Sequence, residues 1–154
     1  MNGRGRVLVV DDDVGIRALI GLVLERAGHE IVGEAGDGAA AVRLASTLRP
    51  DVVTMDIDLP VVDGLTATRR IVRGRLGRVI VVTGSPVAEA EAALAAGADA
   101  QVRKAELASL LLPTVEAVLA SSARRERRSD PAIAPIRGRG TRRNAVGSRT
   151  RRRM

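Results

Sequence analysis

The fold is decided by Val7-Leu8-Val9-Val10-Asp11-Asp12-Asp13, in which a short apolar run ends in three consecutive aspartates. The run has the length of a β-strand and lacks the alternation of a strand with one exposed face. Such a strand is typical of a parallel sheet that helices cover on both sides. Strands are predicted at Val7–Val10, Glu30–Glu34, Asp51–Met55, Val79–Val82 and Ala100–Arg103.

Apolar residues recur at helical spacing between these strands and after the last one. The predicted helices are Ile16–Ala27, Ala39–Leu48, Leu65–Val72, Ala88–Ala96 and Glu106–Leu119. The alternation predicts an α/β fold, a doubly wound five-stranded parallel sheet with helices on both faces. Gly28 and Gly97 end two helices and are predicted to be left-handed caps. Pro113 either kinks the last helix or lies in its first turn, and the sequence does not decide between them.

Length and composition limit the chain to one domain with a tail and exclude several mechanisms. Cys is absent, which excludes disulfides and thiolate chemistry and fits a cytoplasmic location. Aromatic residues are absent too, so this chain supplies no base stacking and no aromatic rotamer switch. No uncharged apolar stretch approaches about 20 residues, so we expect neither a membrane span nor a signal peptide.

The net charge of +7 is distributed unevenly along the chain. Residues 123–154 hold twelve arginines and two acids (+10), whereas residues 1–122 hold 13 basic and 16 acidic residues (−3). We therefore predict a folded domain over residues 1–122 and an Arg-rich, disordered tail over residues 123–154. The tail is interpreted first as a solvated segment. Alternatively, it contacts nucleic acid phosphates or anionic lipid without sequence specificity.

Polar side chains follow the predicted strands. The first strand ends in Asp11, Asp12 and Asp13, the third in Asp56, the fourth in Thr83 and the fifth in Lys104. Ligands of doubly wound sheets bind beyond these carboxyl ends, and carboxylates gathered there repel one another unless a cation such as Mg²⁺ joins them. A carboxylate beside that metal can attack phosphorus, while an ammonium and a hydroxyl neutralise the phosphoryl oxygens. Asp56 is the central candidate for this nucleophile.

Five fragments of the sequence resemble two-component response-regulator receiver domains. They are Val9-Val10-Asp11-Asp12-Asp13, Pro50-Asp51-Val52-Val53-Thr54-Met55-Asp56, Leu59-Pro60 with Asp63-Gly64, Val82-Thr83-Gly84, and Gly97-Ala98-Asp99 followed by Lys104. The resemblance covers Arg6 to Leu119 and implies a flavodoxin-like fold. It also implies a phosphoacceptor that a sensor histidine kinase phosphorylates. Such a protein is not an enzyme beyond its own autophosphorylation and autodephosphorylation.

The resemblance assigns roles at the metal site residue by residue. Asp56 is implied to be the phosphoacceptor and, together with Asp12, a Mg²⁺ ligand through its side chain. Asp11 is implied to be a water-mediated or outer ligand. The backbone carbonyl of Asp58 completes the implied site.

The resemblance also assigns two phosphate-contacting residues. At two other positions this sequence departs from the usual receiver pattern. Thr83 is implied to hydrogen-bond a phosphoryl oxygen, and Lys104 to pair with the phosphate or, before transfer, with Asp56. Gln101 occupies the position three before Lys104, where receivers usually have an aromatic residue that moves inward. Either the switch is altered here, or coupling runs through backbone and loop shifts. Ala105 replaces a common Pro, as in receivers of LuxR-type regulators, and the bond before it is expected to be trans.

The output of the domain is not evident from the sequence. Residues 123–154 lack the apolar periodicity of a helix-turn-helix output domain. We expect output through a partner, through the tail, or through a homodimer on the fourth-helix to fifth-helix face.

Alternative interpretations apply to the whole chain. Asp56-Ile57-Asp58 also resembles the opening motif of haloacid dehalogenase-like phosphatases, in which the second Asp is a general acid. A third interpretation is a nucleic-acid-binding adaptor that acts through the Arg-rich tail.

Single residues also have structural interpretations. Asp13 is interpreted as a helix-opening residue and Asp63-Gly64 as a turn. Thr83 is an alternative helix cap, and His29 is interpreted as a connector between helix and strand.

Overall fold

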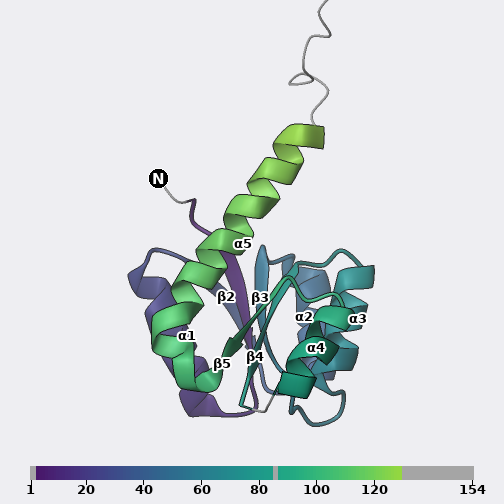
Figure 1. The fold of residues 1–154 in the computed structure, drawn as a ribbon. Helices are drawn as coiled ribbons and strands as arrows, with labels where there is room; N and C mark the ends of the chain where they lie inside the picture. Colours follow the sequence, from purple (N-terminus) through teal and green to yellow (C-terminus); the bar gives the residue numbers. More distant parts are fainter. Residues whose placement is uncertain (1–2, 85–86, 130–154) are drawn as a thin grey trace, which may run out of the picture.

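The structure, a computed structural model, describes residues 3–84 and 87–129, in which strands and helices alternate as predicted (Figure 1). The strands are β1 (Arg6–Val10), β2 (Glu30–Ala35), β3 (Val52–Asp56), β4 (Arg78–Thr83) and β5 (Ala100–Arg103). The helices are α1 (Val14–Arg26), α2 (Gly38–Leu48), α3 (Gly64–Arg73), α4 (Val87–Ala95), the 3₁₀ turn η1 (Lys104–Glu106) and α5 (Leu107–Ser129). One parallel sheet in the order β2-β1-β3-β4-β5 confirms the predicted doubly wound fold.

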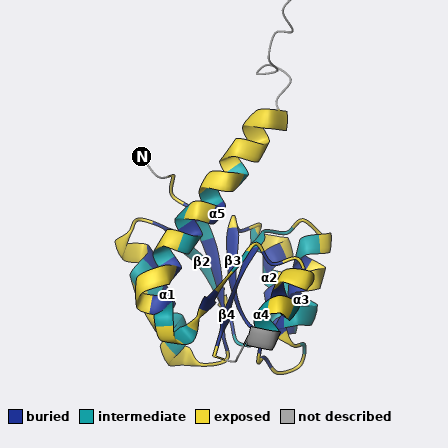
Figure 2. Ribbon diagram, viewed as in Figure 1, coloured by how far each residue is buried: buried dark blue, intermediate teal, exposed yellow. Residues whose placement is uncertain are grey.

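Two hydrophobic clusters, one on each face of the sheet, form the core. Helices α1 and α5 cover one face, where Leu24 and Leu111 pack with apolar strand residues. Helices α2, α3 and α4 cover the other face, where Ala45, Ile71 and Ala93 belong to the second cluster. Figure 2 shows buried strands between the two helical layers. Since the chain has no aromatic side chain, small and branched aliphatic residues fill both layers.

The register of the parallel strands brings the polar strand ends to one edge of the sheet. Val10 of β1 pairs with Met55 of β3, so the residues that follow, Asp11 and Asp56, lie side by side. Strand β4 ends at Thr83 on the same edge. The fold therefore gathers residues that are 45 and 27 positions apart in the sequence.

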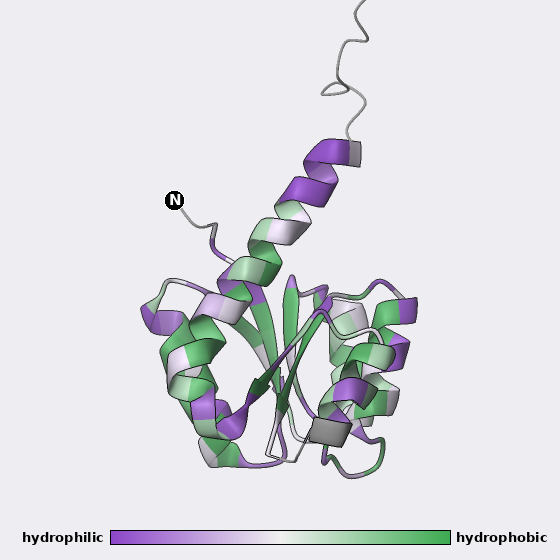
Figure 3. Cartoon of the chain, in the orientation of Figure 1, coloured by the Kyte–Doolittle hydropathy of each residue, from purple (hydrophilic) through white to green (hydrophobic). Residues whose placement is uncertain are grey.

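Helix α5 extends further than the sequence analysis predicted. It ends at Ser129 rather than Leu119, projects beyond the sheet (Figure 1), and is hydrophilic in its last turns (Figure 3). The predicted boundary between residues 122 and 123 therefore falls inside a helix. Residues 123–129, predicted to begin a disordered tail, are helical because Ala, Arg and Glu are strong helix formers that prolong a helix begun in the core. The rest of the predicted tail, residues 130–154, lies outside the described residues.

Helix α5 is also apolar enough to cross a membrane, if length and composition alone are considered over Lys104–Ser129. Leu107, Leu111 and Val115 are, however, buried against the sheet. We therefore regard α5 as a core helix of the domain. Pro113 is the seventh residue of α5, which decides against a place in the first turn.

The left-handed caps predicted at Gly28 and Gly97 are confirmed. The turn predicted at Asp63-Gly64 is the start of a helix. Gly28 and Gly97 have φ angles of 89° and 100°. Asp63 caps α3: its Oδ1 accepts from the Thr66 N–H at 2.9 Å, and its Oδ2 accepts from Thr66 Oγ1 at 2.8 Å. The backbone and side-chain hydrogen bonds from Thr66 hold the pKa of the Asp63 carboxyl below its ordinary value.

Replacing Asp63 with Ala is expected to lower the free energy of unfolding by about 1 kcal/mol at pH 7, the usual contribution of a capping side chain. Because the folded-state pKa is lowered, this stabilisation is complete above the unfolded-state pKa of about 3.9 and is lost as pH falls through the folded-state value. Urea unfolding at pH 7 and near pH 3 should show a smaller difference between the two proteins at acid pH. Equal differences at both pH values would contradict a charged cap.

Candidate functional site

Three carboxylates meet at the carboxyl-terminal edge of the sheet. Asp11, Asp12 and Asp56 each offer one oxygen, and these oxygens lie within 4.8 Å of one another. Asp11 and Asp56 are buried, whereas Asp12 is exposed. The structure thereby confirms that aspartates from two separate strand ends converge.

Lys104 lies between the two buried carboxylates. Its Nζ is 3.1 Å from Asp11 Oδ2 and 3.2 Å from Asp56 Oδ2. The other oxygen of Asp56, Oδ1, accepts a hydrogen bond from the Asp58 N–H at 3.3 Å. The pairing of Lys104 with Asp56 is confirmed, and its pairing with Asp11 is an addition that the sequence did not predict.

The charges at this edge are not balanced. Burial raises the pKa of the Asp56 carboxyl, and the nearby charge of Asp11 raises it further, although Lys104 and the Asp58 N–H act in the opposite direction. Burial also disfavours the charged form of Lys104, but its contacts with Asp11 and Asp56 outweigh burial and raise its pKa. The two buried carboxylates therefore share one ammonium and still repel each other.

The loop after β1 is fixed by its own aspartates and by an arginine. Asp11 Oδ1 accepts from the Asp13 N–H at 2.9 Å, and Asp13 caps α1 by accepting from two N–H groups of the first turn, as predicted. Arg17 Nη1 donates to the Asp11 carbonyl at 2.6 Å, and its Nε lies 3.5 Å from Glu34 Oε1. Arg17 was not predicted, and its place in the first turn of the first predicted helix, Ile16–Ala27, is the only signal for it in the sequence.

The acidic cluster suits a hard divalent cation. Its donors are carboxylate oxygens, the ligands that Mg²⁺ prefers. Asp11 Oδ2 is buried and, within the described part of the chain, has the Lys104 ion pair but accepts no hydrogen bond. The exposed Asp12 gives a hydrated ion access to the buried pair. These residues therefore fit Mg²⁺.

Thr83 and Asp58 lie at the same edge. Thr83 is buried, and its Oγ1 lies 3.5 Å from Oε2 of Glu89 in the first turn of α4. Its contact with a phosphoryl oxygen stays a prediction. The side chain of Asp58 is exposed, and the metal-binding role of its carbonyl also stays a prediction.

Other residues singled out in the sequence lie outside the cluster. Gln101 is exposed on β5, so a polar side chain in solvent takes the usual aromatic position. The described residues include no cis peptide bond, so the bond before Ala105 is trans as predicted. His29 is buried between α1 and β2, and its Nδ1 accepts from the Gly5 N–H at 3.0 Å, which confirms its connecting role.

Replacing Lys104 with Ala is expected to preserve Mg²⁺ binding while destabilising the Mg²⁺-free protein by roughly 1–3 kcal/mol, because two buried carboxylates lose their shared cation. The unfolding temperature of the variant should then rise more on Mg²⁺ addition than that of the wild type. Arg103→Ala is the matched control, since it removes a neighbouring exposed cation paired with Glu106. Identical Mg²⁺ responses in all three proteins would contradict the shared-cation interpretation.

Comparison with known proteins assigns a family. A family model for the response regulator receiver domain matches residues 7–116. The transcriptional regulatory protein PdtaR of Mycobacterium tuberculosis is 41% identical over 112 residues, which cover 72% of this chain and 55% of that protein. Protein-glutamate methylesterase/protein-glutamine glutaminase 3 of Hahella chejuensis is 47% identical over 79 residues, 51% of this chain and 23% of that protein. The chain thus spans about half the length of the first relative and about a quarter of the second.

Two solved structures share the fold. The response regulator domain of Thermotoga maritima CheB is 31% identical with a TM-score of 0.72, covering 77% of this chain and 98% of that one. A LuxR-family two-component response regulator from Aurantimonas sp. SI85-9A1 is 34% identical with a TM-score of 0.72, covering 77% of this chain and 87% of that one. The family match includes the strand-end aspartates and Lys104, and it favours the receiver over the dehalogenase-like interpretation. The chain therefore belongs to the response regulator receiver domain family of two-component systems.

Proposed function

We propose that this chain is the phosphoacceptor of a phosphorelay, in which Asp56 takes a phosphoryl group from a sensor histidine kinase in a Mg²⁺-dependent reaction. The observation that carries the proposal is the buried Asp56 carboxylate, gathered with Asp11, Asp12 and Lys104 at one edge of the sheet. A carboxylate in this setting is a nucleophile with a cation site and an ammonium beside it.

Each residue of the site has its own proposed role in the transfer. A carboxylate oxygen of Asp56 attacks phosphorus, the bond from phosphorus to the donor breaks, and an acyl phosphate forms on Asp56. Asp12 and Asp56 would hold Mg²⁺ through their side chains, with Asp11 as an outer ligand and the Asp58 carbonyl completing the site. The ion, when bound, would neutralise charge on the phosphoryl oxygens. Lys104 exchanges its Asp56 contact for the phosphoryl group, and Thr83 donates its hydroxyl to it. We propose that the chain turns over no other substrate and is not an enzyme in that sense.

The output of this reaction is proposed to be a conformational change that a partner or a second copy reads. Leu94 on α4 and Leu110 on α5 are 51% and 43% exposed, which supports a homodimer on the α4–α5 face. The Arg-rich tail is proposed to make accessory, non-specific nucleic acid contacts because of its charge. We propose a cytoplasmic location, where a histidine kinase presents its phosphoryl group.

The proposal predicts metal-dependent phosphorylation of the intact chain. Incubation with a small phosphodonor and Mg²⁺ should add the mass of one phosphoryl group, because the cation offsets repulsion between the carboxylates and the donor. Excess EDTA should reduce the initial rate of phosphorylation at least about tenfold, a loss of about 1.4 kcal/mol in transition-state stabilisation. Intact-mass spectrometry measures both samples directly. Equal labelling with and without EDTA would contradict a role for the metal.

A further inference from the structure

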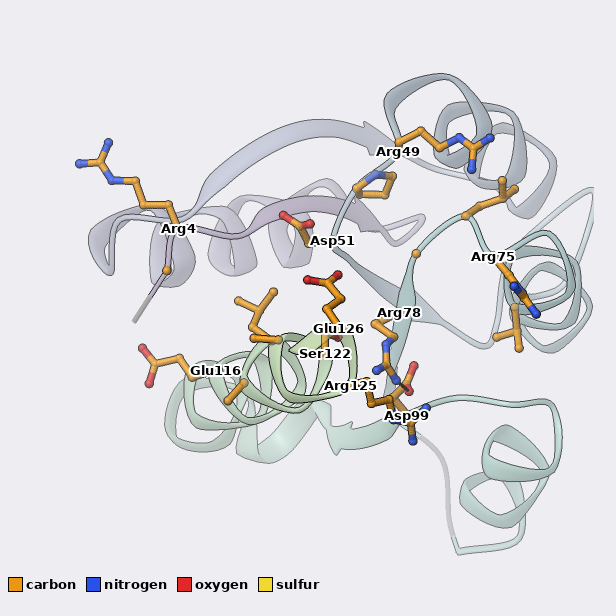
Figure 4. A pocket seen from close by; sticks show the side chains of 18 of the residues that line it. Arg4, Arg49, Asp51, Arg75, Arg78, Asp99, Glu116, Ser122, Arg125 and Glu126 are labelled. Atoms are coloured by element: carbon orange, nitrogen blue, oxygen red, sulfur yellow. Dashed lines mark hydrogen bonds and ion pairs between the residues drawn. The ribbon is translucent and has the colours of Figure 1, made fainter. Parts of the chain in front are cut away.

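A large hollow lies at the amino-terminal edge of the sheet, at the end of the strands opposite the aspartate cluster (Figure 4). It has a volume of about 1350 Å³ and is bounded by the loops before β3 and β4 and by the last turns of α5. We call it the arginine hollow after Arg4, Arg49, Arg75, Arg78, Arg125 and Arg127, which line it. Because small-molecule sites measure roughly 300–1,000 Å³, a segment of a polymer suits this hollow better.

Most guanidinium groups of the arginine hollow are unpaired. Its six arginines face four carboxylates, an excess of two positive charges. Arg78 pairs with Asp99, whereas the other five arginines form no ion pair with any residue that the structure describes. Guanidinium groups bind phosphate through two parallel hydrogen bonds, so a phosphorylated polymer matches this lining.

Two of these arginines adopt a backbone conformation that suits glycine better. Arg49 and Arg75 have φ angles of 49° and 51°, and they are two of the three described non-glycine residues with a positive φ. Arg49 follows α2 before β3, Arg75 precedes β4, and Figure 4 shows both on the same side of the hollow. An arginine in the left-handed region is strained where glycine is not. Both occur where a helix ends, since Arg49 is the C-cap of α2 and Arg75 follows the C-cap of α3, and glycine is the usual left-handed residue at such ends. Arginine in place of glycine at both ends points to a role for the side chains.

The lining of the hollow favours RNA over a protein partner. Val72, Leu76 and Leu119 also line the hollow, but none of them is among the large apolar side chains that the described residues leave exposed, so its accessible charge is the feature that a partner meets. The chain has no aromatic residue for base stacking, so recognition has to use the backbone of the nucleic acid. Glu116 and Glu126 also line the hollow without an ion pair and can accept hydrogen bonds from ribose 2′-hydroxyl groups, which DNA lacks.

We infer that the arginine hollow binds single-stranded RNA through its phosphodiester backbone, without sequence preference and independently of Asp56. The test measures the affinity of the full chain for a fluorescent 12-nucleotide oligouridylate between 50 and 200 mM salt. The double variant Arg49→Gln/Arg75→Gln should lose about 20-fold in affinity at 100 mM salt. Its slope of log affinity against log salt should fall by about 1.4, because two single-strand phosphate contacts are lost.

The matched control is the double variant Arg26→Gln/Arg43→Gln, which removes the same charge from exposed helix positions outside the hollow. It should bind within about threefold of the wild type, since only general electrostatic attraction changes. Equal affinities of the two double variants, whether both are lowered or both match the wild type, would overturn the inference and assign binding to overall charge or to the Arg-rich tail. Oligothymidylate binding as tight as oligouridylate, or stronger competition by polyglutamate than by RNA, would overturn the assignment to RNA.

A third double variant separates the side chains from the backbone. Arg49→Gly/Arg75→Gly should lose RNA affinity like the Gln pair, yet unfold at a temperature no lower than the wild type, because glycine relieves the strained φ angles. A clear fall in its unfolding temperature would show that the two arginines serve the fold, and this would overturn the inference.

Discussion

Replacing Asp56 with Asn is expected to abolish phosphorylation by a small phosphodonor, reducing the labelled fraction at least about 100-fold. Asn has nearly the same shape, so the fold should persist, but its amide oxygen is a poor nucleophile. Asp11 and Asp12 keep their carboxylates in the variant, but in the proposed site both serve the cation and not phosphorus. Intact-mass spectrometry with Mg²⁺ and the phosphodonor measures the labelled fraction of the variant against the wild type.

Asp58→Asn is the matched control for this experiment. Asp58 lies two residues from Asp56 and is exposed, and the backbone N–H that it donates to Asp56 is unchanged by the substitution. Labelling should therefore stay close to that of the wild type. If Asp56→Asn were labelled as strongly as the wild type, the phosphoacceptor would lie elsewhere in the chain. If Asp58→Asn lost labelling, the exposed carboxylate itself would take part.

The sequence predicted the site because parallel strands constrain where their ends lie. Once Val7–Val10 and Val52–Met55 are neighbouring parallel strands, the residue after each must be at the same edge, and this places Asp11 next to Asp56. The types of these residues then indicate the ligands of the site, since three carboxylates and one lysine at one edge favour the binding of a cation and a phosphoryl group. Neither step needs side-chain conformations, and so both were accessible from the sequence.

Details that depend on distance or on competing preferences could not be predicted. The bridge from Lys104 to Asp11 and the contact of Arg17 with the Asp11 carbonyl depend on side-chain conformation at the sheet edge. The end of α5 was misjudged for another reason. In residues 123–129, like-charge repulsion favours disorder while the helix propensity of Ala, Arg and Glu favours continuation, and the helix already held by the core continues.

Gly64 is the clearest case in which a short distance to a neighbouring backbone requires a particular residue. Asp63-Gly64 was interpreted as a turn, yet Gly64 is the first residue of α3, and its N–H donates to the Ile57 carbonyl at 2.9 Å. A Cβ atom at this position would lie 1.9 Å from the Asp56 carbonyl oxygen and 2.7 Å from the Ile57 Cα. Both atoms belong to the backbone that carries the phosphoacceptor, so no flexible side chain can move aside.

Replacing Gly64 with Ala is therefore expected to destabilise the protein by about 3 kcal/mol, at the upper end for an overpacked site, and to reduce Mg²⁺-dependent phosphorylation by displacing Asp56. Helix propensity alone predicts the opposite sign, because Ala is favoured over Gly by about 1 kcal/mol. Gly21→Ala, inside α1, is the control. A Cβ at position 21 meets nothing closer than the Ile31 side chain at 4.0 Å, so this substitution should stabilise the protein by about 0.5–1 kcal/mol. Urea unfolding measures both. Stabilisation by both substitutions would mean that α3 does not approach the Asp56 backbone this closely.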